Sequence, residues 1–152
     1  NVNFIDESNN PIGVDMSDAA SLDDKPVTEL HLPKGKKVLF KFRSQDVLHS
    51  AYMPHFRAQM NCVPGMVTQF AFTPKYTTEE MRLQSEVVDK VQRINKIRSE
   101  KGEDLYEFDY ILLCNKICGA SHFSMQMKIV VEEEEDYENW LAEQPTYGEV
   151  IN

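Results

Sequence analysis

Residues 110–125 read YILLCNKICGASHFSM. The pattern predicts a strand over Phe108–Leu113, and the residues after it carry four side chains with metal-binding donor atoms: Cys114, Cys118, His122 and Met125. Thiolate and thioether sulfur are soft ligands that favour copper, and imidazole suits copper or zinc. A strand that leads directly into a loop of such donors indicates a metal site at the edge of a β-structure.

The second cysteine of this loop bears on how many metal ions it could hold. One His, one Cys and one Met are the ligand set of single-copper electron-transfer sites, and Cys118, His122 and Met125 would supply it. The additional thiolate of Cys114, four residues earlier, allows two sulfurs to bridge a pair of metals. Such a pair needs a second imidazole, for which the chain offers three candidates: His31, His49 and His55.

Zinc binding and a disulfide are the competing interpretations of the same cluster. Positions 114, 118 and 122 would share one face of a helix and could hold zinc. Gly119 and the preceding strand pattern favour a loop, and a zinc knuckle usually separates its cysteines by two residues. A Cys114–Cys118 disulfide would leave His122 and Met125 without a role. Cys62 stands alone, so we expect it to be a small buried apolar residue.

Several short strands with turn signals between them predict a β-sandwich. Val27–Leu32 and Val38–Phe42 are expected to form a hairpin around the turn at Pro33–Lys36, with one buried face. We expect loop and a short strand over His49–Asn61. The other predicted strands are Val67–Phe72, Phe108–Leu113, Met127–Val131 and a possible short one at Val2–Ile5.

Two helical segments interrupt the strand pattern. Thr77 and Glu80 fit a capping box, and apolar residues then recur at helical spacing at Val87, Val91, Ile94 and Ile97. These features predict a helical insert over about 77–103 that ends at Gly102. A short C-terminal helix is predicted over Asp136–Glu143, which would pack through Tyr137, Trp140 and Leu141.

Length and composition restrict the remaining possibilities. The chain has 152 residues, 41% of them hydrophobic, which suits one domain with one core. We expect an N-terminal arm over 1–26, the domain over 27–144 and a C-terminal tail over 145–152. No stretch supplies the roughly 20 apolar residues of a membrane helix, and the start lacks a signal peptide, so we expect any membrane anchor to lie outside this chain. The formal net charge of −9 argues against nucleic acid and permits a basic protein partner.

Two segments together resemble subunit II of cytochrome c oxidase, in its soluble binuclear-copper (CuA) domain. The loop Cys114–Met125 looks like the copper loop of that family. The segment Arg43–Ser50, followed by Pro54 and Phe56, resembles the family's strand end that carries the first copper histidine. Val63-Pro64-Gly65 and Phe72-Thr73-Pro74 follow in the family's order, and the resemblance runs from about Glu29 to Val131, interrupted by the insert.

This resemblance implies a cupredoxin-like Greek-key sandwich with two copper ions and a set of six ligand residues. Cys114 and Cys118 would bridge both coppers. His49 and Met125 would complete one copper, and His122 with the backbone carbonyl of Lys116 would complete the other. The family often has Glu where Lys116 stands, so the magnesium contact of that carboxylate is not implied here. No Trp occurs in the first half of the chain, where the family has one that receives electrons.

The resemblance also implies a function and partners. The domain would take electrons from cytochrome c, or a similar basic donor, and pass them to the haem of subunit I. It would be a subunit of an oxidoreductase in the bacterial inner membrane, exposed on the periplasmic side, without oxygen chemistry or catalytic residues of its own. Separately from the resemblance, we expect an acidic face with residues among Asp104, Glu107 and Glu132–Asp136 to dock a basic cytochrome c. The alternatives are a single-copper cupredoxin carrier, a zinc-stabilised module, and a CuA domain of a nitrous or nitric oxide reductase.

Overall fold

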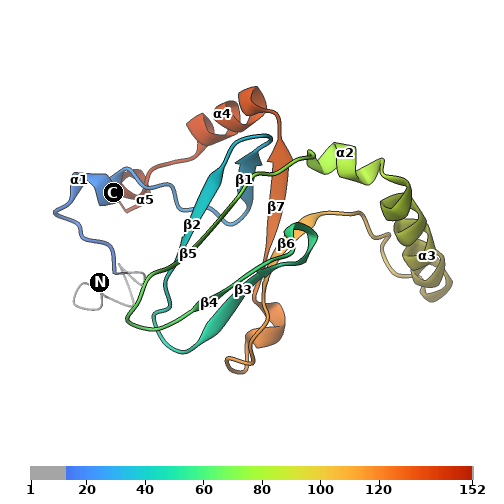
Figure 1. Ribbon diagram of the computed structural model, residues 1–152, viewed down its shortest axis with the longest axis horizontal. Coiled ribbons are helices and arrows are strands. Elements are labelled where there is room, and N and C mark those ends of the chain that lie inside the picture. The colour runs from blue at the N-terminus through green and yellow to red at the C-terminus, as the bar shows by residue number, and fades with distance from the viewer. Residues whose placement is uncertain (1–12, 152) are drawn as a thin grey trace.

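The computed structural model describes residues 13–151, which form two β-sheets with helices around their edges (Figure 1). The larger sheet has five strands, in the order β1 (Leu30–Pro33), β7 (Gln126–Glu132), β6 (Tyr110–Cys114), β3 (His49–Met53) and β4 (Ala58–Cys62). The smaller sheet pairs β2 (Val38–Phe42) with β5 (Thr68–Phe72). Strands β1 and β7 run parallel, whereas the other pairs are antiparallel. The prediction of a β-sandwich is therefore confirmed.

The core lies between the two sheets, because alternate side chains of each strand point inward. Met53, Ile129 and Val131 are almost completely buried on the inner face of the large sheet. Aromatic rings fill the space toward the small sheet, with Phe40 stacked on Phe72 at 5.3 Å between ring centroids. This packing leaves the ends of β3 and β6 at one rim of the sandwich.

The predicted hairpin between the first two strands is wrong. Strand β1 pairs with β7 and strand β2 with β5, so the turn joins two different sheets. Backbone hydrogen bonds fix this crossing, because Lys34 N–H donates to the carbonyl of Glu132 and Gly35 N–H donates to that of Pro74. The segment His49–Asn61, expected to be loop and a short strand, contains most of two strands joined by the 3₁₀ turn η2 (Pro54–Phe56). The possible strand at Val2–Ile5 lies outside the described residues.

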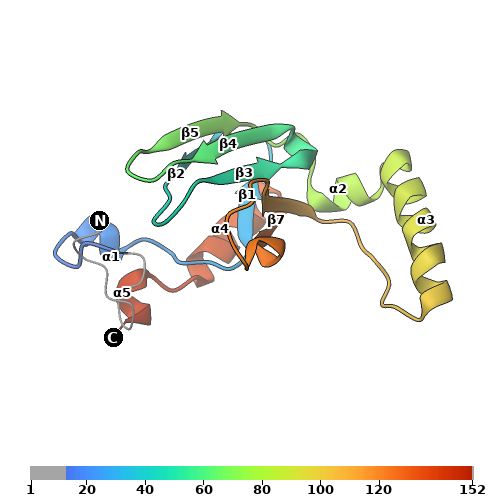
Figure 2. The same cartoon turned by 90° about the horizontal axis from the view of Figure 1, so that it is seen from below.

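The helical insert is confirmed as two helices, α2 (Thr78–Arg82) and α3 (Ser85–Lys101). Thr77 and Glu80 form the predicted capping box at the start of α2. Gly102 ends α3 with a φ of 68°, a left-handed conformation that glycine adopts without strain. Figure 2 shows that α3 stands away from the sandwich. The C-terminal helix is α4 (Glu134–Glu143), which packs beside β1 and begins two residues earlier than predicted.

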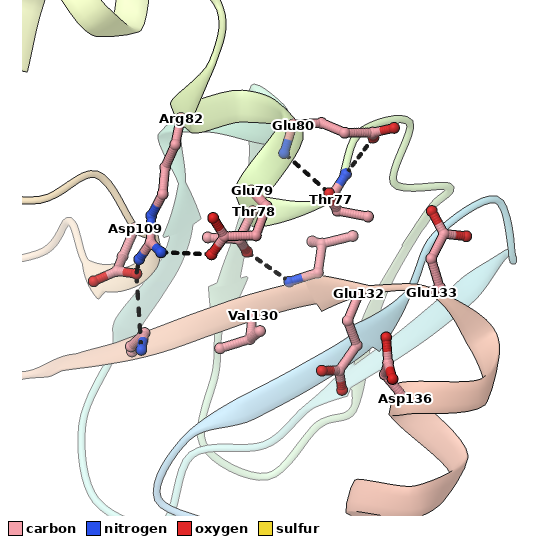
Figure 3. A pocket seen from close by; sticks show the side chains of 12 residues that line it. Thr77, Thr78, Glu79, Glu80, Arg82, Asp109, Val130, Glu132, Glu133 and Asp136 are labelled. Atoms are coloured by element: carbon pink, nitrogen blue, oxygen red, sulfur yellow. Dashed lines mark hydrogen bonds and ion pairs between the residues drawn. The ribbon is translucent and has the colours of Figure 1, made fainter.

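Polar contacts attach α2 to the large sheet (Figure 3). The Thr78 hydroxyl accepts a hydrogen bond of 2.9 Å from the backbone N–H of Val131. Arg82 lies 2.9 Å from Asp109, and Lys128 continues the network from Asp109 across β7. A pocket of about 430 Å³ lies beside these contacts, but it contains no sulfur or imidazole donor. This region therefore serves to position α2.

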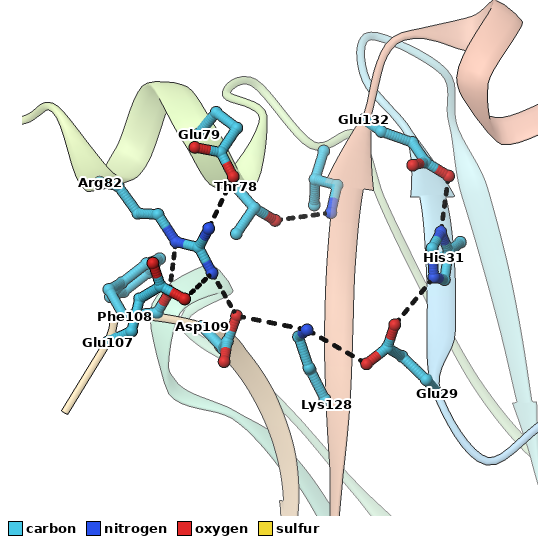
Figure 4. A network of polar contacts seen from close by, with 11 residues as sticks. Glu29, His31, Thr78, Glu79, Arg82, Glu107, Phe108, Asp109, Lys128 and Glu132 are labelled. Carbon is cyan, nitrogen blue, oxygen red and sulfur yellow. Dashed lines mark hydrogen bonds and ion pairs between the residues drawn. The ribbon is translucent and has the colours of Figure 1, made fainter. Parts of the chain in front are cut away.

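His31 belongs to the same polar network and not to the predicted metal site (Figure 4). Its two ring nitrogens lie 3.0 Å from Glu29 and 2.6 Å from Glu132. Its ring also stacks on Trp140 of α4 at 4.0 Å, so it helps to hold that helix against β1.

The two ends of the described chain lie side by side. Helix α1 (Ala19–Leu22) contacts α5 (Tyr147–Val150), and the N–H of Tyr147 donates to the carbonyl of Asp24 at 2.6 Å. Lys25 donates to the carbonyl of Gln144 at 2.5 Å. Within residues 13–151, no helix combines the length and the apolar character that crossing a bilayer requires.

Candidate metal centre

The first two donors lie at the ends of neighbouring antiparallel strands. His49 begins β3 and Cys114 ends β6, and the register pairs Ala51 with Cys114. Residues directly opposite one another in an antiparallel pair point to the same face, as do residues two apart. His49 and Cys114 therefore share the inner face of the sheet at its rim. A hydrogen bond of 2.9 Å from Asn115 N–H to the carbonyl of Ser50 extends this pairing into the loop.

The remaining donors come from the loop between β6 and β7. The backbone N–H of Cys114 donates to the carbonyl of Met125 at 3.0 Å, which closes the loop at its base. Gly119 has a φ of 144°, a backbone conformation that side chains disfavour, and the 3₁₀ turn η3 (His122–Ser124) follows. The loop expected from Gly119 and the preceding strand is confirmed, and it places His122 and Met125 back beside the cysteines.

The two thiols of this loop are close together and unbonded. The Sγ atoms of Cys114 and Cys118 are 3.7 Å apart, well beyond the ~2.05 Å of a disulfide. Two sulfurs that each bind one metal at about 2.3 Å can be separated by up to about 4.6 Å. Both sulfurs can therefore contact the same ion.

The other proposed donors surround this pair of sulfurs. The Nδ1 atom of His49 is 3.8 Å from the sulfur of Cys114, and the carbonyl oxygen of Lys116 is 3.2 Å from it. The Nδ1 atom of His122 is 3.5 Å from the sulfur of Cys118, and the Met125 sulfur is 3.3 Å from it. The fold thus brings together all six residues that the family resemblance implies as ligands.

The arrangement is elongated along the line of the two sulfurs. The donor atoms of His49, Cys114 and Cys118 all lie within 4.8 Å of one another, and His122 is outside that group. A single ion with bonds of about 2.0–2.3 Å cannot contact donors much further apart than this. The described donors therefore suit two ions that share the sulfurs better than one ion.

Asp46 orients the imidazole of His49, and sequence reasoning did not single it out. The carboxylate lies 2.7 Å from Nε2 of His49, which leaves Nδ1 directed at the sulfur. This hydrogen bond, followed by the contact with Cys114, raises the pKa of His49, and it lowers the pKa of Asp46 to about 2. A metal-binding histidine commonly has its second nitrogen fixed in this way. The three-residue spacing of Asp46 and His49 was the only signal in the sequence.

The thiols titrate as a coupled pair. Desolvation raises the pKa of Cys114, but hydrogen bonds at Ser50 and Lys116 and contacts with His49 and Cys118 outweigh it and lower the pKa to about 6. Desolvation, and then the neighbouring Cys114, raise the pKa of Cys118. The pair therefore gives up its first proton more readily than an ordinary thiol, which prepares it for a metal cation.

An apolar hollow of about 330 Å³ lies behind the donors, where the sandwich opens at its rim. Its walls include Phe42, Cys62, Leu112 and Met127. Cys62 is buried, as expected for a lone cysteine, and burial raises its pKa. The third candidate histidine, His55, is elsewhere and packs edge-on against Phe108. Of the three candidates, only His49 reaches the cysteines.

The chain is similar to known oxidase subunits. It is 38% identical over 141 residues to an alternative cytochrome c oxidase subunit 2 of Bradyrhizobium diazoefficiens, covering 91% of this chain and 40% of that protein. It is 27% identical over 112 residues to cytochrome c oxidase subunit 2 of Thermostichus vulcanus, covering 74% of this chain and 25% of that protein. The chain thus spans less than half the length of these curated relatives. No family model matches it.

A solved structure supports the same fold. The periplasmic domain of subunit II of cytochrome oxidase from Bradyrhizobium japonicum matches with a TM-score of 0.54 at 17% identity, covering 85% of this chain and 71% of that one. The fold is that of a cupredoxin-like domain, and its rim carries a His/Cys/Cys group that could hold a metal ion. This chain is a CuA-type domain related to subunit II of cytochrome c oxidase. Copper is the cofactor that fits, since the donors combine soft sulfur with imidazole.

Proposed function

We propose that this domain transfers electrons one at a time through a binuclear copper centre held by Cys114, Cys118, His49, His122, Met125 and the carbonyl of Lys116. The observation that carries this proposal is the pair of free thiols 3.7 Å apart, with one imidazole Nδ1 beside each sulfur. Bound copper would supply the redox chemistry, sharing one electron between two metals. A single-copper carrier would need only one of these thiols.

The protein's own residues hold the donors in place. Strand pairing and the closed loop base fix Cys114, and Asp46 fixes the ring of His49. A rigid donor set reduces the structural change that accompanies each change of charge. Met125 would be the weak ligand that tunes the potential. The apolar wall of Phe42, Leu112 and Met127 would restrict water behind the centre.

We further propose that the domain works within an oxidase complex on the periplasmic side of a bacterial inner membrane. It would accept electrons from a basic cytochrome c and pass them to the haem of subunit I. The similarity to oxidase subunits supports membership of such a complex, and the likeness in fold to a periplasmic domain agrees with that side of the membrane. Oxygen reduction would belong to the complex and not to this domain.

The acidic surface on α4 is the one that we favour for attracting the electron donor. It lies at the far end of β7 from the copper ligands, so it would steer the donor at long range while electrons enter nearer the copper loop. In the acidic run 132–136, Glu133 and Glu134 pair with lysines, and Glu132 contacts His31. Glu135 and Asp136 are exposed and make none of the ion pairs found among the described residues, so they are free to attract a cationic partner. Electron transfer from a basic cytochrome c should then slow as salt rises, because salt screens attraction between exposed charges. An equal rate at low and high salt would refute this surface.

Copper titration of the reduced domain tests the central proposal. We expect two coppers per chain, a purple colour and an EPR hyperfine pattern from one electron shared by two nuclei. His49→Gln should lower copper affinity and disturb the spectrum, whereas the matched change His31→Gln should leave both intact. One copper per chain with a blue colour would identify a single-copper cupredoxin. A colourless protein that binds zinc tightly would point to a structural site.

A further inference from the structure

Helix α3 and its return loop, residues 102–108, form an arm on the outside of the sandwich (Figure 2). Only the start of the helix reaches the core, where Val87 and Val91 pack against the buried cluster. The second half of the helix lies beside the return loop. Ile97, which the helical spacing assigned to the apolar face, is 55% exposed. The arm therefore contributes little to closing the sandwich.

The arm is nevertheless fixed in position. The side-chain amide of Asn95 donates to the carbonyl of Tyr106 at 3.0 Å and accepts from its N–H at 2.7 Å. Arg98 donates to the carbonyl of Asp104 at 2.9 Å and lies over the ring of Tyr106. A helix of this length is only marginally stable alone, so these contacts keep its distal half ordered. An ordered segment outside the core presents a defined surface.

The charge of α3 is opposite to that of the rest of the chain. The helix has five basic and three acidic side chains, a formal charge of +2, which leaves −11 for the remainder. Four of the basic side chains are exposed and take part in none of the ion pairs found within residues 13–151: Lys90, Arg93, Lys96 and Lys101. We call these four residues the basic arm surface.

The composition of this surface favours a protein over a lipid bilayer. An interfacial helix buries a continuous apolar face among acyl chains. The apolar residues of α3 form no such continuous free face, because Val87 and Val91 pack against the core and Ile97 is the one largely exposed apolar residue of the helix. Three acids, Glu86, Asp89 and Glu100, also stand among the cations and would be repelled by anionic headgroups. A surface of mixed charge that is positive overall is better suited to a protein partner whose carboxylates match the positions of these cations.

We propose that the basic arm surface docks an acidic surface of another subunit of the oxidase complex. This proposal rests on the proposed function in one respect, since it requires the domain to be part of that complex. The arm would serve assembly. It would be separate from the acidic surface on α4 that attracts the electron donor, because a basic cytochrome c is repelled by a basic surface. On the return loop, Glu107 pairs with Arg82, and Arg98 donates to the backbone carbonyl of Asp104.

Lysine footprinting of the purified complex tests this assignment. An amine-acetylating reagent is applied to the complex and to the isolated domain, and each lysine is quantified by mass spectrometry. Lys90, Lys96 and Lys101 should be modified several-fold more slowly in the complex. Lys37 and Lys75, exposed on the body of the domain, report that the reagent is equally active in both samples. A carbodiimide, which joins amines to carboxylates directly, should then link the arm to Asp or Glu of another subunit.

Equal modification of the arm lysines in both samples would overturn the proposal. Protection with cross-links only to a second copy of this chain, or protection that disappears when anionic lipid is removed, would also overturn it. Arg93→Glu with Lys96→Glu should lower the salt concentration that strips this subunit from the complex, and Lys37→Glu with Lys75→Glu should not. The copper-to-protein ratio and EPR spectrum of the arm variant should match those of the wild type, so failed docking is distinguishable from a failed copper site.

Discussion

The copper-free domain should contain one thiol whose reactivity hardly depends on pH between 6 and 8. Surroundings of Cys114 lower its pKa from 9.0 to about 6. At pH 7 such a thiol is about 90% thiolate, compared with about 1% for a thiol with a pKa of 9. A less basic thiolate is a weaker nucleophile, by about 16- to 32-fold over three pKa units. The net advantage of Cys114 is therefore about four-fold at pH 7 and about 20-fold at pH 6.

The assay is alkylation of the reduced apo-domain with iodoacetamide, followed by peptide mass spectrometry. From pH 8 to pH 6 the rate at Cys114 should fall only about two-fold, because the thiolate fraction falls from about 99% to about 50%. The same cysteine in the urea-unfolded chain should slow by nearly 100-fold over that range. Replacing the neighbouring imidazole by His49→Gln should raise the apparent pKa, and His31→Gln provides the matched control.

A ten-fold fall in rate for each pH unit in the folded apo-domain would refute this reasoning. Such a result would mean that the hydrogen bonds at Ser50 and Lys116 do not stabilise the thiolate. Alkylation must be quantified at both cysteines, because the first pKa is a property of the Cys114–Cys118 pair and not of one thiol. If Cys118 were alkylated first, with the same flat pH profile, the low first pKa of the pair would stand. The thiolate would then be assigned to Cys118 and not to Cys114.

Three further predictions concern the scaffold, each measured by urea unfolding. Thr77→Ala should reduce stability by about 0.5–2 kcal/mol because it removes the capping box of α2; an unchanged midpoint would contradict this. Ile129→Ala should cost about 2–5 kcal/mol, since Ile129 is fully buried, whereas Ile97→Ala on the exposed arm should stay within about 0.5 kcal/mol. Burial lowers the pKa of His55 from 6.5, and its Nδ1 finds no hydrogen-bond partner within residues 13–151, so near this pH the unfolded chain binds a proton more readily than the folded chain does. Wild type should therefore lose stability as pH falls below 6.5, and His55→Phe should lose less; equal losses would refute the assignment.

Local chemistry explains which parts of the fold the sequence predicted well. Thr77 and Glu80 act within one helical turn, and Gly102 ends the helix through its own backbone conformation, so neighbouring residues sufficed. The short strands β5, β6 and β7 were recognisable as short, largely apolar segments between turn signals. The pairing of β1 was not, because its partner β7 lies about 100 residues later. Alternation shows that a strand has a buried face, but it does not show which strand lies beside it.

For the metal site too, the residues that lie close in sequence were predicted and the distant one was not chosen by spacing. Cys114, Cys118, His122 and Met125 were identified from their spacing and chemistry, because one loop carries them all. Spacing could not choose among three histidines, and the resemblance to the oxidase family selected the one that the fold places at Cys114. Asp46 was missed because an exposed acid near a histidine is common in any sequence.

The closed base of the loop has a consequence for how this site can be altered. Five of the six proposed donors lie between Cys114 and Met125, and a backbone hydrogen bond joins those two residues. We therefore expect that this loop can be replaced as a unit. Its length and metal ligands could change without altering the buried residues of the sandwich. Only His49 stays behind with the scaffold, anchored to Asp46. Grafting a different loop at these two residues would give the same β-framework a new metal chemistry, with one imidazole already in place.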